Sequence, residues 1–125
     1  MRTFPGIIKT AASVLAMAGS VALLHTPAIA AEAEASAVEQ GKELAFDRKK
    51  GNCLACHQMD DGDLPGNIGP PLIAMKARFP DKAKLRAQIW DATKSNPNTI
   101  MPPFGRHQAL SEGDIDKIVE YVYTL

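Results

Sequence analysis

A Cys-x-x-Cys-His motif at residues 53–57 constrains this chain more than any other feature of its sequence. Thiols three residues apart lie on one face of a helical turn, and the histidine that follows can project its imidazole toward a metal between them. This is the spacing of a c-type haem attachment site, in which Cys53 and Cys56 form thioether bonds to the porphyrin and His57 ligates the iron. The motif therefore predicts one covalently bound haem c.

The N-terminal segment has the features of a cleaved export signal. Arg2 and Lys9 supply a basic start, residues 11–24 an apolar run, and Ala28-Ile29-Ala30 a small-residue cleavage site. The apolar run is shorter than the about 20 residues that a membrane-spanning helix needs. We therefore predict cleavage after residue 30 and one exported domain, residues 31–125, with residues 31–35 frayed and no membrane span.

The size and charge of the mature chain narrow its function. Removing residues 1–30 of the 125 leaves 95, which is enough for one small domain. The signal takes two basic residues with it, so 12 basic residues stand against 14 acidic ones, without the basic excess of a nucleic-acid binder. A domain this small buries only roughly 60 to 65% of its unfolded surface, so it often needs a disulfide, a metal or a cofactor.

Other uses of a Cys-x-x-Cys pair fit this sequence less well. Export would permit a disulfide, but a redox-active pair usually follows a strand in a βαβ unit, and nothing before Cys53 has a strand pattern. A structural zinc site needs four ligands, and beyond the motif only His107 is available in the mature chain. A haem remains the favoured interpretation.

Caps and apolar periodicity predict an all-α domain. A capping box at residues 36–39 opens a first helix that runs to about Lys50 and is ended by Gly51. A middle helix is expected at about residues 81–94, with an apolar face made of Leu85, Ile89 and Ala92, and a shorter turn at about residues 73–78. No segment has a strand pattern.

The first helix should pack closely against a helix at the C-terminus. Gly41 and Ala45 are four residues apart and leave a small-residue groove on one helix face. Ser111 can form a capping box with Asp114, while Leu110 is placed for a hydrophobic staple with the fourth helical residue. The helix that follows carries an apolar stripe made of Ile115, Ile118, Val119, Tyr121, Val122 and Leu125.

The segments between these helices contain too much proline and glycine for regular structure. We expect them to wrap the apolar faces of the haem, which would complete a core that the chain is too short to build alone. These prolines and glycines are Gly62, Pro65, Gly66, Gly69, Pro70, Pro71, Pro97, Pro102, Pro103 and Gly105.

The second axial ligand of the iron is predicted by position in the chain. Met59 is too close to His57 to reach the opposite haem face, and Met75 falls in a helical turn where a core role fits better. Met101 lies in a loop stiffened by flanking prolines, which reduces the entropy lost when a thioether is held on iron. Met101 is therefore the predicted second ligand. The alternatives are that Met101 only fills space at the haem edge, or that His107 or water is the ligand.

His/Met ligation leaves no open coordination position and raises the haem potential. It suits outer-sphere electron transfer and disfavours a haem enzyme such as a peroxidase, which needs an open position with an acid or base beside it. Trp90 and Phe104 are expected to pack against the haem.

Four segments carry a family resemblance: residues 51–57, 64–72, 96–105 and 121–125. They resemble the SoxX family, the small monohaem cytochrome subunits of SoxAX sulfur-oxidation complexes, over essentially the whole mature chain. The blocks Pro-Gly-Asn-Ile-Gly-Pro-Pro-Leu and Asn-Pro-Asn-Thr-Ile-Met-Pro-Pro-Phe-Gly are more specific than the haem motif itself.

The resemblance implies a class I cytochrome c fold, a periplasmic location and a heterodimer with SoxA. In that scheme thiosulfate is joined oxidatively to a cysteine of the carrier SoxYZ, an L-cysteine S-thiosulfotransferase reaction, and this chain passes the electrons to a soluble cytochrome c without being the catalytic subunit. The resemblance also implies that the Pro70 carbonyl accepts a hydrogen bond from the His57 ring and that Leu72 packs on the haem. The alternative is a free-standing periplasmic electron shuttle.

Overall fold

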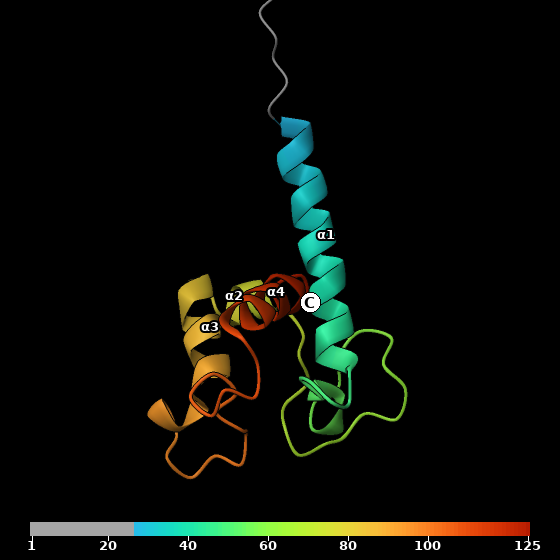
Figure 1. The fold of residues 1–125 in the computed structure, drawn as a ribbon. Helices are drawn as coiled ribbons and strands as arrows, with labels where there is room; N and C mark the ends of the chain where they lie inside the picture. The colour runs from blue at the N-terminus through green and yellow to red at the C-terminus, as the bar shows by residue number, and fades with distance from the viewer. Residues whose placement is uncertain (1–26) are drawn as a thin grey trace, which may run out of the picture.

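The structure is a computed structural model that describes residues 27–125, and side chains from residue 36 onward. Most of the predicted export signal, residues 1–26, lies outside the described residues. The described part is helical without a strand, as predicted (Figure 1). Its elements are α1 (Pro27–Phe46), the 3₁₀ turn η1 (Cys53–Ala55), α2 (Met75–Arg78), α3 (Lys82–Trp90), the 3₁₀ turn η2 (Ala92–Lys94) and α4 (Glu112–Val122).

The crossing of α1 and α4 forms the centre of the fold (Figure 1). A Cβ at Gly41 would collide with the backbone carbonyl of Lys117, and Ala45 is fully buried, so the two helices approach as closely as the predicted groove allows. Phe46, the last residue of α1, packs edge-on against Tyr121, with ring centroids 6.2 Å apart. The small-residue groove is therefore confirmed as the contact between the first and last helices.

A capping box starts α4, as predicted. The Asp114 backbone N–H donates to the Ser111 hydroxyl at 3.1 Å, and the Ser111 N–H donates to the Asp114 carboxylate at 3.3 Å. Leu110 and Ile115 are both buried, as a hydrophobic staple requires. The buried face of α4 comprises Ile115, Ile118, Val119, Tyr121 and Val122.

The first helix differs from its predicted bounds at both ends. Instead of starting at the capping box, α1 begins at Pro27 and includes residues 31–35, which we expected to be frayed. Proline is favoured in a first helical turn and the alanine-rich segment after it has high helix propensity, so the local cap signal is overridden. Ser36 instead accepts a hydrogen bond from Gln40 within the helix. At the other end α1 stops at Phe46, and a turn follows in which the Gly51 N–H donates to the Leu44 carbonyl.

The middle helix forms with a break that periodicity did not predict. Asp81 caps α3, accepting from the Ala83 N–H at 2.9 Å, and the predicted apolar face of Leu85, Ile89 and Ala92 is buried. The helix ends at Trp90 because the Asp91 side chain accepts from the Thr93 N–H and opens the separate turn η2. The short turn predicted near residues 73–78 is α2. None of the helices described is long and apolar enough to cross a membrane.

A pair of glycine substitutions tests the α1–α4 crossing. Gly41→Ala is expected to lower the free energy of unfolding by about 1–3 kcal/mol, because the new methyl group meets backbone that cannot move aside cheaply. Gly113→Ala, in α4, places its Cβ in open space, with no atom within 4 Å beyond the adjoining backbone of its own helix, and should raise stability by up to about 1 kcal/mol. Urea unfolding of the two variants measures both effects. Equal unfolding midpoints for them would contradict the close crossing.

Candidate functional site

A largely apolar cavity of about 620 Å³ lies between the Cys-x-x-Cys-His turn, the loops and the inner faces of α2, α3 and α4. Its volume is in the range of small-molecule and cofactor sites. The cavity brings together most of the residues that sequence analysis selected, although they are far apart in the chain. The selected residues among those lining it are Cys53, Cys56, His57, Pro70, Leu72, Met101 and Phe104.

The two cysteines are presented by a tight turn. Residues 53–55 form η1, and the backbone N–H groups of Cys56 and His57 both donate to the Cys53 carbonyl, at 3.1 and 2.9 Å. Side chains at i and i+3 eclipse one another in a 3₁₀ turn, so the thiols of Cys53 and Cys56 share one face. Both cysteines are free, as attachment of a haem requires.

The imidazole of His57 is held in one orientation. Its Nδ1 lies 2.7 Å from the Pro70 carbonyl oxygen, which is the contact implied by the family resemblance. Because a carbonyl only accepts, Nδ1 carries the proton and Nε2 is left free to bind a metal. A Cβ at Gly69 would collide with this ring, so glycine is required beside it. The turn therefore presents a histidine with a defined tautomer toward the cavity.

Arg78 stabilises the loop that orients His57, a role that sequence analysis missed. Its Nη1 donates to the Pro71 carbonyl at 2.8 Å, one residue after the carbonyl that accepts from the histidine. The same Nη1 lies 3.4 Å from the sulfur of Met75, which lines the cavity and is almost fully buried. Met75 is thus engaged as a core residue, as its position in a helical turn indicated.

Met101 enters the cavity from the long loop between η2 and α4. Its backbone N–H donates to the Thr99 hydroxyl at 3.2 Å, and the next turn closes with the Phe104 N–H donating to the Pro102 carbonyl at 3.0 Å. Of the other candidate ligands, Met75 also lines the cavity, Met59 is buried in the core outside the cavity lining, and His107 does not line the cavity.

Trp90 lies outside the cavity lining, where contact with the haem was expected. It is the last residue of α3, and its ring packs so closely over Gly105 that a Cβ there would overlap it. The Arg86 guanidinium lies over the same ring, 5.4 Å from its centroid. Trp90 therefore closes the base of the Met101 loop, whereas Phe104, buried at the cavity wall, occupies the expected place.

The environment of Cys53 does not suit thiol–disulfide chemistry. Burial in the apolar wall raises the pKa of the Cys53 thiol to about 11, whereas reactive Cys-x-x-Cys thiols have lowered pKa values. Among residues 27–125, the structure describes no cluster of three or more His, Cys, Asp or Glu side chains able to bind a metal ion. An apolar cavity with two adjacent thiols and an oriented histidine at one wall fits a covalently attached haem.

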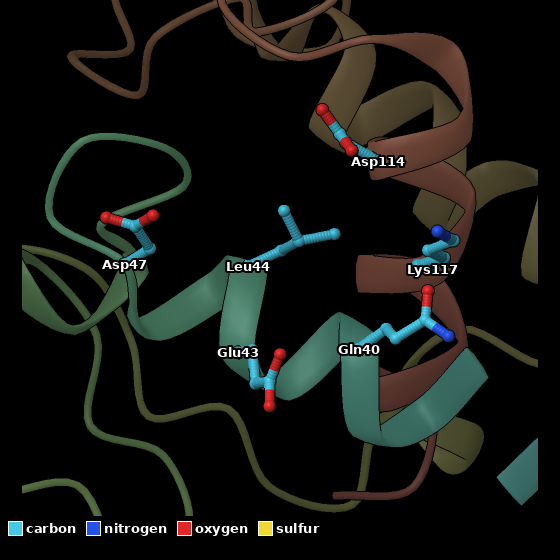
Figure 2. A pocket seen from close by; sticks show the side chains of 6 residues that line it. All are labelled: Gln40, Glu43, Leu44, Asp47, Asp114 and Lys117. Atoms are coloured by element: carbon cyan, nitrogen blue, oxygen red, sulfur yellow. The ribbon is translucent and has the colours of Figure 1, made fainter. Parts of the chain in front are cut away.

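A second hollow of about 260 Å³ lies between α1 and the start of α4 (Figure 2). Leu44 projects into it, and the other side chains around it are polar: Gln40, Glu43, Asp47, Asp114 and Lys117. It contains no thiol or imidazole and is less than half the size of the first cavity. This hollow therefore lacks the groups that could attach or ligate a haem.

Comparison with known proteins agrees with this geometry. The crystal structure of SoxXA from P. pantotrophus is similar over 69% of this chain and 79% of that chain, with 28% sequence identity and a TM-score of 0.62. An uncharacterized lipoprotein of Aquifex aeolicus (strain VF5) is 36% identical over 76 residues, which are 60% of this chain and 37% of that protein. The chain thus spans little more than a third of the length of this curated relative.

The family described as cytochrome c oxidase, cbb3-type, subunit III, matches residues 36–122, which include every residue of the cavity wall named above. The predicted helical cytochrome c fold and the predicted resemblance to SoxX are both confirmed. The chain belongs to this cytochrome c family and is a SoxX-like monohaem cytochrome.

Proposed function

We propose that this chain is the electron-carrying SoxX subunit of a periplasmic SoxAX complex, with haem c bound covalently through Cys53 and Cys56 and iron ligated by His57 and Met101. The observation that carries the proposal is the cavity in which the attachment motif and Met101 meet. The similarity in fold to SoxXA supports the choice of complex.

The protein contributes a rigid and dry setting for the cofactor. A bound haem c supplies reversible one-electron chemistry at its iron. Cys53 and Cys56 would hold it by two thioether bonds, and the Pro70 carbonyl accepts a hydrogen bond from His57 Nδ1, which fixes the ring and would strengthen the ligand as a base. Buried apolar residues of the wall exclude water; these include Leu85, Ile89, Leu110, Ile118 and Val122.

Ligation of the iron by Met101 would make this a site that carries electrons and does not bind substrate. His57 and Met101 would hold the iron of the haem, and two protein ligands of this kind would suit outer-sphere electron transfer better than the binding of oxygen, peroxide or thiosulfate. Ile68 and Ile100 line the cavity and are 62% and 72% exposed, which leaves an apolar rim suited to contact with a redox partner.

The partner in this proposal is SoxA, which forms a heterodimer with this chain and binds thiosulfate. Oxidative joining of thiosulfate to the SoxYZ carrier cysteine releases two electrons, which this chain accepts one at a time and passes to a soluble cytochrome c. The complex is the L-cysteine S-thiosulfotransferase, and the isolated chain is its electron outlet.

Co-elution and spectroscopy together test this role. The purified holoprotein should co-elute with its cognate SoxA at dilute concentration, and thiosulfate should reduce its haem only when SoxA and SoxYZ are both present. Thiosulfate added to the holoprotein alone should leave the oxidised spectrum unchanged. A chain that remains monomeric beside SoxA and accepts electrons equally well from an unrelated oxidoreductase would instead be a free-standing shuttle.

A further inference from the structure

The loop that carries Met101 is closed at its base by residues that do not line the cavity. The Trp90 carbonyl accepts from the Gly105 N–H at 3.1 Å, which joins the end of α3 to the far end of the loop. Beside this bond, the Asp91 carboxylate lies 3.5 Å from Nε of Arg106. Residues 91 and 106 therefore face each other across the neck of the loop that carries Met101.

Asp91 is an unusual residue for such a place. It is the one charged side chain among the described residues that is buried, with 2% of its surface exposed. Its Oδ1 accepts from the Thr93 hydroxyl at 2.5 Å and from the Thr93 N–H at 3.1 Å, but its buried Oδ2 has no hydrogen-bond partner. An unsatisfied buried carboxylate oxygen is costly, so the guanidinium at 3.5 Å is its main compensation.

From this geometry we infer that Asp91 and Arg106 form a positioning clamp that holds the Met101 loop closed over the haem. This inference rests on the proposed role of Met101 as an iron ligand. Opening the loop far enough to free Met101 separates Arg106 from Asp91 and leaves a buried charge without its partner. The open state is thereby disfavoured, although neither residue contacts the cofactor site.

Cyanide binding to the ferric holoprotein measures how often the loop opens, because an external ligand reaches the iron only when Met101 has left it. Its apparent affinity is the intrinsic affinity multiplied by the open fraction. Arg106→Gln removes the cation and should raise the apparent affinity for cyanide about threefold to fivefold, as expected for loss of a half-exposed ion pair. The methionine–iron charge-transfer band should still be present without cyanide.

Three further variants complete the test. Asp91→Asn keeps an acceptor for Thr93 and should raise the cyanide affinity as Arg106→Gln does. Combining the two substitutions should raise the affinity no further, because each of them alone already breaks the same contact. Lys42→Gln is the matched control. It removes one positive charge from an ion pair at 2.7 Å with Asp60, outside the loop and its neck, and should leave the cyanide affinity within about twofold of wild type.

The clamp is refuted if the cyanide affinity of Arg106→Gln stays within about twofold of wild type. It is also refuted if Lys42→Gln raises the cyanide affinity as much as Arg106→Gln does. If Asp91→Asn fails to fold, Arg106→Gln decides alone, because its side chain is half exposed. A wild-type ferric protein without the methionine–iron band overturns the clamp together with the ligand role of Met101. An intact band in a protein that takes no electrons from SoxA overturns the proposed function and leaves the clamp standing.

Discussion

Replacing both Cys53 and Cys56 with serine is expected to abolish covalent haem binding and to leave a poorly folded chain. The cavity of about 620 Å³ is walled by the inner faces of three helices, so its contents form much of the core. At about 24 cal/mol per Å³, an emptied space of this size costs on the order of 10 kcal/mol. That is comparable to the entire 5–15 kcal/mol by which ordinary domains are stable.

Haem absorbance of the denatured protein and far-ultraviolet circular dichroism measure the two losses separately. The single variant Cys56→Ser is the matched control, since it retains one thioether and should yield folded protein with less bound haem. An exported double variant with wild-type helix content would contradict the view that the haem completes the core.

Met101→Ala is expected to convert a six-coordinate low-spin haem into one that binds water or cyanide, with a reduction potential lower by on the order of 100 mV. Axial ligands together span roughly 0.8 V of haem potential, and loss of the thioether removes the ligand that favours the ferrous state. Absorption spectra and a redox titration measure the two changes.

Two other substitutions serve as controls for that variant. His107→Ala should leave the spectrum unchanged, because His107 does not line the cavity. Met75→Leu should also keep the low-spin spectrum, because the Met75 sulfur is engaged by Arg78 and its role is packing. If either of these variants opened a coordination position on the iron while Met101→Ala kept the low-spin spectrum, the ligand assignment would be reversed.

The parts of the fold that were predictable from sequence are those specified by neighbouring residues. The Ser111–Asp114 capping box and the stripe that follows it act within two helical turns, and both form in the structure. Gly41 and Ala45 indicated a close helix crossing because small residues on one helix face leave room for the backbone of a second helix to approach. The start of α1 was mispredicted because a local cap motif competed with the high helix propensity of the residues before it.

In the candidate site, the haem motif and the place of Met101 in the cavity lining were accessible from sequence because cysteine, histidine and the prolines around Met101 carry strong positional signals. The Pro70 contact was implied only by the family resemblance. Arg78 and the Asp91–Arg106 pair were missed because they join segments whose spacing depends on the tertiary fold. Only the Asp91-Ala92-Thr93 run had a local signal, since an aspartate two residues before a threonine can form an Asx turn that ends a helix.

The mass of the purified exported protein tests the central claim most directly. We predict a chain that begins at residue 31 and carries one haem, and a tryptic peptide Gly51–Lys76 that holds this haem through both cysteines and resists release by reducing agents. A chain of the same length at its apoprotein mass, or with a reducible disulfide between Cys53 and Cys56, would contradict the assignment of this protein as a haem c electron carrier.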